Sequence, residues 1–229
     1  MSITISKSTL QFLKDLSENN NRPWFNDNKD RYTAAYENMI GFAEALIDEM
    51  SHHDHLVPMS GKKSLFRIYR DVRFSKDKSP YKNNFAGGLK RATKWLRGGY
   101  YYHIEPGTSF AGGGFWGPNT ADLKRIRDEI AADHQPLMKI ISSPTFKKTF
   151  GTLQGETVKT APKGFDKDHP AINLLRHKQF LISRPFTEAE VTSPNFVKEL
   201  SQTFQKMRPF FDYMSEVLTT DSNGVPIED

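Results

Sequence analysis

The chain contains no cysteine, and this excludes disulfides, thiol catalysis and thiolate metal ligands. Nowhere does an apolar run approach the roughly 20 residues that a membrane-spanning helix needs. The first seven residues also lack the apolar core of a secretory signal, so none is expected. These absences predict a cytoplasmic protein that does not enter the membrane.

What is present is a typical globular composition with an uneven distribution of charge. Of the 229 residues, 37% are hydrophobic and 26% are charged, which fits a folded domain with its own core. The net charge is only +5, yet residues 61–99 carry 12 cations and two anions. Such asymmetry indicates contact with phosphate or nucleic acid. The alternative is that acidic helices elsewhere in the chain pack beside this segment.

The order of hydrophobic periods predicts the α+β class. Apolar residues recur at helical spacing over about 8–19, 26–51, 120–132 and from 193 onward, with short helical pieces within 135–150. Strands are predicted at 64–74, 85–89, 100–105, 109–116 and 179–183. We therefore expect a single domain over residues 1–220, with a central, mostly antiparallel sheet flanked by N-terminal and C-terminal helices. Residues 221–229 are expected to be a frayed tail.

The most basic part of the chain is the sixteen-residue segment 67–82, with six cations and two anions. Its odd-numbered positions would share one face of the predicted strand 64–74, while Arg70 falls on the apolar face. Guanidinium groups bind phosphate or carboxylate oxygens in two-pronged fashion. We therefore predict an anion site formed by Arg67, Tyr69, Arg70, Arg73, Lys76, Lys78 and Lys82. The alternative is a set of ion pairs to acids such as Asp27, Asp30 or Glu37.

Three residues are candidates for acid–base catalysis. His103 and Glu105 have the same parity in the strand predicted at 100–105, so both side chains project from one face. Asp71 lies among the cations of the basic segment. A histidine held in place by its neighbours for structural reasons is the alternative for His103. The run of glycines at 112–114 would either admit a ligand or, as we favour, mark a bulge or a packing contact.

No metal site is predicted, and the cofactor and oligomeric state are left open. Residues 52–55 read His-His-Asp-His, which is rich in metal-ligand side chains. Adjacent residues rarely converge on one ion, however, and zinc motifs use other spacings. We interpret this stretch as the solvated end of a helix.

Four signatures, in this order, resemble one protein family. They are Asn19–Phe25 with Asn28-Lys29, the segment Arg67–Lys82, Tyr101–Pro106 with Gly112–Gly114, and Ala161–Phe165 with His169-Pro170 and Leu175–Lys178. Together they resemble the domain of unknown function 2461 family, which is widespread and mainly bacterial, over roughly residues 10–218. The resemblance implies a single α+β domain and supplies no reaction, cofactor or catalytic residue. It also suggests that Arg176 and Lys178, in the fourth signature, join the anion site.

Three functions follow from these residues. The first is an enzyme acting on a small phosphorylated or carboxylated compound. In it Arg67, Arg73 and Lys78 would hold the anion, while Asp71, His103 or Glu105 would transfer protons. The second is a nucleic-acid-binding module that uses residues 61–99, including Trp95 as a base-stacking ring. The third is an adaptor with no ligand, in which every basic residue is paired internally.

Overall fold

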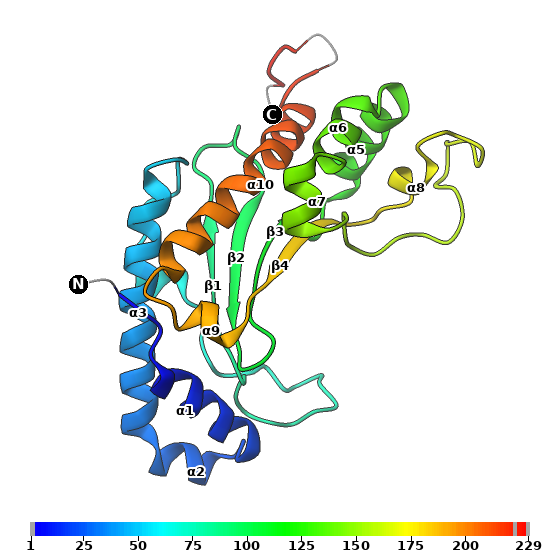
Figure 1. Cartoon of the computed structure of the whole chain (residues 1–229). Coiled ribbons are helices and arrows are strands. Elements are labelled where there is room, and N and C mark those ends of the chain that lie inside the picture. Colours follow the sequence, from blue (N-terminus) through cyan, green and yellow to red (C-terminus); the bar gives the residue numbers. More distant parts are fainter. Residues whose placement is uncertain (1–2, 222–223, 228–229) are drawn as a thin grey trace. The chain divides into compact units, whose positions relative to one another are not determined.

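The computed structural model describes residues 3–221 and 224–227 of the chain (Figure 1). In these residues the helices are α1 Lys7–Glu18, α2 Arg22–Asp27, α3 Lys29–Ser51, α4 Gly61–Ser64, α5 Thr120–Ala132, α6 Gln135–Ile141, α7 Pro144–Phe150, α8 Ile172–Leu175, α9 Glu188–Val191 and α10 Phe196–Thr219. The strands are β1 Phe85–Lys90, β2 Gly99–Ile104, β3 Phe110–Phe115 and β4 Phe180–Pro185. They form one antiparallel sheet in the order β1-β2-β3-β4. The α+β class with an antiparallel sheet is therefore confirmed.

The chain divides into two compact units, each made of several segments. The first contains residues 1–89, 101–111 and 185–202, and the second contains residues 90–100, 112–184 and 203–229. The predicted domain boundaries remain a prediction. Of the predicted frayed tail, residues 222, 223, 228 and 229 lie outside the described residues. The Ile227 amide donates to the Thr219 carbonyl at 2.9 Å.

In the first unit, local capping and alternate burial position the strand that carries the site. The Ser6 side chain accepts from the Thr9 amide to begin α1, and Asn21 accepts from the Trp24 amide to begin α2. Burial alternates along β2, as expected for a strand with one face in the core. Its even-numbered positions are buried, and the ring of Tyr102 packs edge-to-face on Phe42 of α3. The odd-numbered side chains are only partly buried, so they can contact a ligand.

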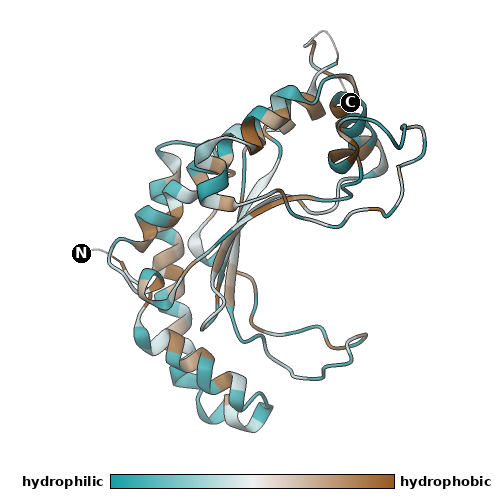
Figure 2. Ribbon diagram, turned by 45° about the vertical axis from the view of Figure 1, so that its right-hand side comes forward, coloured by the Kyte–Doolittle hydropathy of each residue, from teal (hydrophilic) through white to brown (hydrophobic). Residues whose placement is uncertain are grey.

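In the second unit, close packing accounts for the run of glycines. A Cβ on Gly113 would lie 2.6 Å from the Phe211 ring of α10, and one on Gly114 would lie 2.2 Å from the Phe180 carbonyl oxygen. Gly114 also has a φ of 127°, which disfavours any side chain. The packing interpretation is thus confirmed for Gly113 and Gly114. The described residues include no helix with the length and apolar character to cross a bilayer, and the helical ribbons of Figure 2 mix teal with brown.

The predicted strand at 64–74 is wrong. Residues 61–64 form the short helix α4, and the segment that follows meets other chain only at isolated bridges, including Leu65 to Gly87 and Tyr69 to Tyr81. A strand needs a continuous ladder of backbone partners, and alternation of side chains does not supply one. Beyond Ile68 the chain leaves the sheet and forms a long loop, blue-green in Figure 1.

Candidate functional site

The residues 67–82, called the basic loop here, neutralise part of their own charge. Arg70 forms an ion pair with Asp77, which also accepts hydrogen bonds from the amide and the hydroxyl of Ser79. The hydrogen bond from the Ser79 hydroxyl is the largest cause, followed by that from Arg70, and together these donors hold the pKa of the Asp77 carboxyl well below its usual range. Arg73 forms a two-pronged pair with Asp71, through Nε at 3.0 Å and a terminal nitrogen at 2.6 Å. Asp71 therefore serves as an ion-pair partner inside the loop.

Four of the six cations in the basic loop have no acidic partner among the described residues, and they are Arg67, Lys76, Lys78 and Lys82. Across residues 3–221 and 224–227, no carboxylate lies within ion-pair distance of Arg67 or Lys82. Arg67 is exposed and Lys82 is half-buried. Burial, followed by repulsion from Arg67, lowers the pKa of the Lys82 ammonium. Two like charges that repel each other provide a favourable place for an anion.

The other predicted anion ligands of the loop are placed differently. Lys78 Nζ donates to the Val72 carbonyl at 2.9 Å, and the Lys76 side chain is exposed. The Tyr69 ring lies 5.5 Å from Tyr81, at the base of the loop. Of the cations without an acidic partner, Arg67 and Lys82 are therefore the two beside Phe66, whose ring stacks on Tyr101 of β2.

The predicted pairing of His103 with Glu105 is present, and Tyr101 extends it. The side chains of three residues project from the same side of the chain in and just beyond β2. We call these residues, Tyr101, His103 and Glu105, the β2 row. His103 Nε2 lies 2.8 Å from a Glu105 carboxylate oxygen, and the Tyr101 hydroxyl lies 3.0 Å from His103 Nδ1. A carboxylate only accepts, so Nε2 donates to it. When the imidazole carries a single proton, on Nε2, its Nδ1 atom accepts and the Tyr101 hydroxyl donates.

Aromatic rings fix the β2 row and join it to the basic loop. The Phe110 ring stacks on His103 with centroids 5.0 Å apart, and the Phe66 ring stacks on Tyr101 at 6.2 Å. Lys82 Nζ lies 5.8 Å from the centroid of that same Phe66 ring. Burial, followed by the charge of Glu105, raises the pKa of the Tyr101 hydroxyl, so it stays a proton donor at neutral pH.

The Glu105 end of the row opens on a cavity of about 830 Å³. Its lining comes from α1, α9, the end of β2 and the residue that follows Lys82, and consists of Lys7, Leu10, Gln11, Leu13, Lys14, Ser17, Glu18, Asn83, Glu105, Pro106, Gly107, Glu188, Ala189 and Thr192. The Ser109 hydroxyl donates to the Glu105 carbonyl and accepts from its amide, which fixes the turn at the cavity edge. Sequence reasoning missed the α1 and α9 walls, because nothing in the local sequence relates them to β2.

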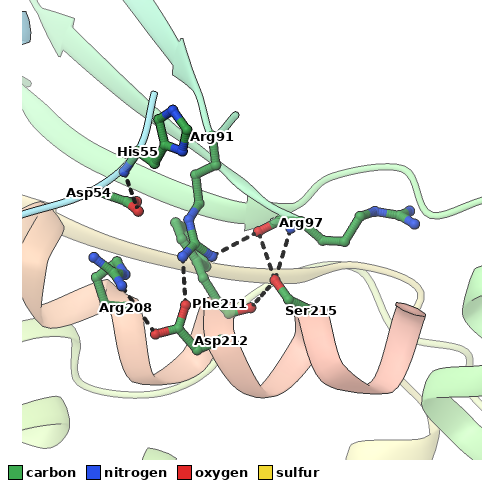
Figure 3. Close-up of polar contacts among 8 residues, drawn as sticks. All are labelled: Asp54, His55, Arg91, Arg97, Arg208, Phe211, Asp212 and Ser215. Atoms are coloured by element: carbon green, nitrogen blue, oxygen red, sulfur yellow. Dashed lines mark hydrogen bonds and ion pairs between the residues drawn. The ribbon is translucent and has the colours of Figure 1, made fainter. Parts of the chain in front are cut away.

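The second cationic stretch, residues 90–97, belongs to the second unit. There the Arg91 guanidinium is fully buried and forms an ion pair with Asp212 at 2.6 Å, while Arg208 approaches the other oxygen of Asp212 at 3.5 Å (Figure 3). The Ser215 hydroxyl donates to the Phe211 carbonyl and accepts from the Arg97 amide. These contacts tie the stretch to α10.

Arg176 and Lys178 also belong to the second unit, whereas the basic loop belongs to the first. Lys178 forms an ion pair with Glu156 at 2.6 Å. The Nε atom of Arg176 is buried and has no hydrogen-bond partner among the described residues. Their membership of the anion site remains a prediction. Residues 3–221 and 224–227 contain no group of three or more histidine and acidic side chains suited to a metal ion.

Fold and site together define an α+β protein with a hydrogen-bonded row of tyrosine, histidine and glutamate beside a cavity. The chain belongs to the family described as conserved hypothetical protein (DUF2461), whose model matches residues 8–213. The resemblance drawn from the four signatures is therefore confirmed. No curated protein and no solved structure matches the chain.

Proposed function

We propose that this protein is an enzyme that transfers protons to or from a small phosphorylated or carboxylated compound. The observation that carries the proposal is the hydrogen-bonded β2 row, whose carboxylate end lines the 830 Å³ cavity. A carboxylate held by a histidine at the edge of a concave site has the arrangement of a general base.

Each member of the row has a separate task. Glu105 uses one oxygen to accept from His103, which leaves the other oxygen for a proton of the substrate. His103 orients that carboxylate and stabilises it as an acceptor. Tyr101, which is half-buried, holds the imidazole in the tautomer that donates to Glu105.

The anionic group of the substrate would be bound by Arg67 and Lys82. Both lack a carboxylate partner within the described part of the chain, and Phe66 connects Lys82 to the row. Asn83, the neighbour of Lys82, lines the cavity that Glu105 also lines. A compound spanning these groups would place its acidic end at the cations and its reacting carbon or oxygen at Glu105.

The test is a panel of phosphorylated and carboxylated compounds, incubated with the protein and followed by ³¹P and ¹H NMR. We expect turnover of one chemical class, a loss of about 100-fold or more in Glu105→Gln, and a smaller loss in His103→Gln. Glu188→Gln is the matched control, because it removes a carboxylate from the same cavity but outside the row. If no member of the panel reacts, and none shifts the NMR signals of His103, the proposal is wrong.

One observation favours the second candidate, nucleic-acid binding. Phe74 lies in the basic loop with its side chain almost entirely in solvent, next to the exposed Arg73. Rings among cations stack on unpaired bases. Binding of a fluorescent single-stranded oligonucleotide would then weaken steeply between about 50 and 200 mM salt and fall on Phe74→Ser. Trp116→Ser, which removes another exposed aromatic ring in the second unit, serves as the control.

A further inference from the structure

We infer that the second unit contains a separate binding site for a small anion that carries a planar ring, such as a pyrimidine nucleoside monophosphate. The site is a cavity of about 220 Å³ lined by residues of the second unit, whereas the β2 row belongs to the first. Its walls come from the stretch after β1, the start of α5 and the chain around the end of α10, and consist of Lys94, Trp95, Arg97, Asn119, Ala121, Asp122, Arg125, Leu218, Thr219 and Ile227.

The charge of this lining is unbalanced in favour of cations. Among the described residues that line it, Asp122 is the only acid, and Arg97 already neutralises that carboxylate at 2.5 Å. Arg125 is half-buried, and within residues 3–221 and 224–227 no ion pair or hydrogen bond holds its guanidinium. Lys94 adds a second cation without a carboxylate partner among the same residues. An anion entering the cavity would therefore meet two charges that no acid in the described part of the chain neutralises.

An aromatic wall accompanies these cations. The Trp95 side chain is 39% exposed, and Lys94 Nζ lies 4.7 Å from its ring centroid. Thr93, two residues earlier, has a φ of 70°, a backbone conformation that costs free energy for a residue other than glycine. Its hydroxyl accepts from the Trp95 amide at 3.3 Å. This local geometry presents the indole at the cavity instead of packing it in the core.

The size and chemistry of the walls indicate the ligand class. A cavity of 220 Å³ suits a compact ligand with a single ring better than a drug-sized molecule. The indole offers a stacking face for that ring, while the guanidinium of Arg125 matches the geometry of a phosphate. Both features are needed at once, so the ring alone and the phosphate alone should each bind more weakly.

The experiment uses the full-length chain with Trp24→Phe and Trp116→Phe, which leaves Trp95 as the only tryptophan of the three. Its fluorescence is titrated with uridine monophosphate, uridine and inorganic phosphate. We expect saturable quenching by the nucleotide, with uridine and phosphate each at least about 10-fold weaker, equivalent to roughly 1.4 kcal/mol.

Two variants then separate the cavity from general charge. Arg125→Gln should weaken nucleotide binding about 10-fold or more, since a charged hydrogen bond is lost. Lys124→Gln is the matched control on the same helix, because its side chain faces Asp128 at 2.5 Å and does not line the cavity. It should change the affinity less than about twofold. If Arg125→Gln alters the thermal midpoint, Lys94→Gln replaces it with the same expectation.

Binding that fails to saturate with the nucleotide, or equal losses in Arg125→Gln and Lys124→Gln, would overturn the inference. Glu105→Gln, in the first unit, should leave this binding unchanged. The outcome is therefore independent of the proposed acid–base function.

Discussion

The pairing of β1 with β2 depends on the absence of a side chain at Gly87, and Gly87→Ala tests this directly. A Cβ at this position would lie 2.3 Å from the Tyr102 hydroxyl oxygen, 2.4 Å from Cζ and 2.7 Å from Cε1. Carbon atoms in contact normally sit about 3.5–4.0 Å apart. The Tyr102 ring would therefore have to move by more than about 1 Å.

The cost of that movement follows from how Tyr102 is held. Its side chain is 1% exposed, and its ring packs edge-to-face against Phe42 with centroids 5.8 Å apart. An added carbon in such a packed core costs typically about 1–3 kcal/mol, and we expect about 3 kcal/mol here because the clash involves three ring atoms. Since Tyr102 lies between Tyr101 and His103 on β2, the same displacement should disturb the proposed acid–base row.

Urea unfolding followed by circular dichroism measures the effect. Gly41→Ala is the control, because the nearest atom to its Cβ is 3.9 Å away and alanine favours the α3 helix. It should raise the free energy of unfolding by about 0.5–1 kcal/mol. In a Tyr102→Ala background, Gly87→Ala should cost less than about 0.5 kcal/mol, because the clashing ring is gone. A Gly87→Ala protein as stable as the wild type, or strictly additive losses, would refute the reasoning.

Three further predictions concern charge. Burial raises the pKa of the Tyr32 hydroxyl to about 12, so the free energy of unfolding should fall as the pH rises from about 10 to about 12. Tyr32→Phe should reduce this fall by about 1–2 kcal/mol, after allowance for partial exposure, and an unchanged profile would contradict this. The pKa of Lys82 is lowered, so its protonated form costs stability below its folded pKa and the cost fades as pH rises toward 10.5. Lys82→Met should therefore raise the thermal midpoint at pH 7 but weaken any anion ligand, and stronger ligand binding would count against the proposed site. Asp212→Asn should lower the free energy of unfolding by about 2–3 kcal/mol, because Asp212 pairs with the buried Arg91 guanidinium; denaturation titrations showing a loss below about 0.5 kcal/mol would show that the pair is dispensable.

The sequence predicted those features that depend on local periodicity. The helix expected at 120–132 matches α5, and the shared parity of His103 with Glu105 becomes a hydrogen bond of 2.8 Å. Side-chain period is a property of the strand itself, so it can be counted in the sequence. Membership of the family could also be predicted from the sequence, because the signatures that indicate it are contiguous stretches.

What could not be predicted depends on partners distant in sequence or on the path of a loop. The alternation at 64–74 looks like a strand, yet only a neighbouring backbone can make it one. Arg70 and Arg73 were expected to seek distant acids or a ligand, and instead they pair with Asp77 and Asp71 of the same loop. The Glu188 wall of the cavity lies more than eighty positions from Glu105, and no local pattern relates the two.

The basic loop is attached at its base rather than along its length. The Asn20 side chain binds both the amide and the carbonyl of Tyr81, and the Phe25 ring stacks on Tyr81 at 3.9 Å. Four trypsin-sensitive residues lie between, at Arg70, Arg73, Lys76 and Lys78. A protease cut there would separate the piece with α1 to α4 from the piece with all four strands, and the contacts of Asn20 and Phe25 with Tyr81 would still join the two pieces.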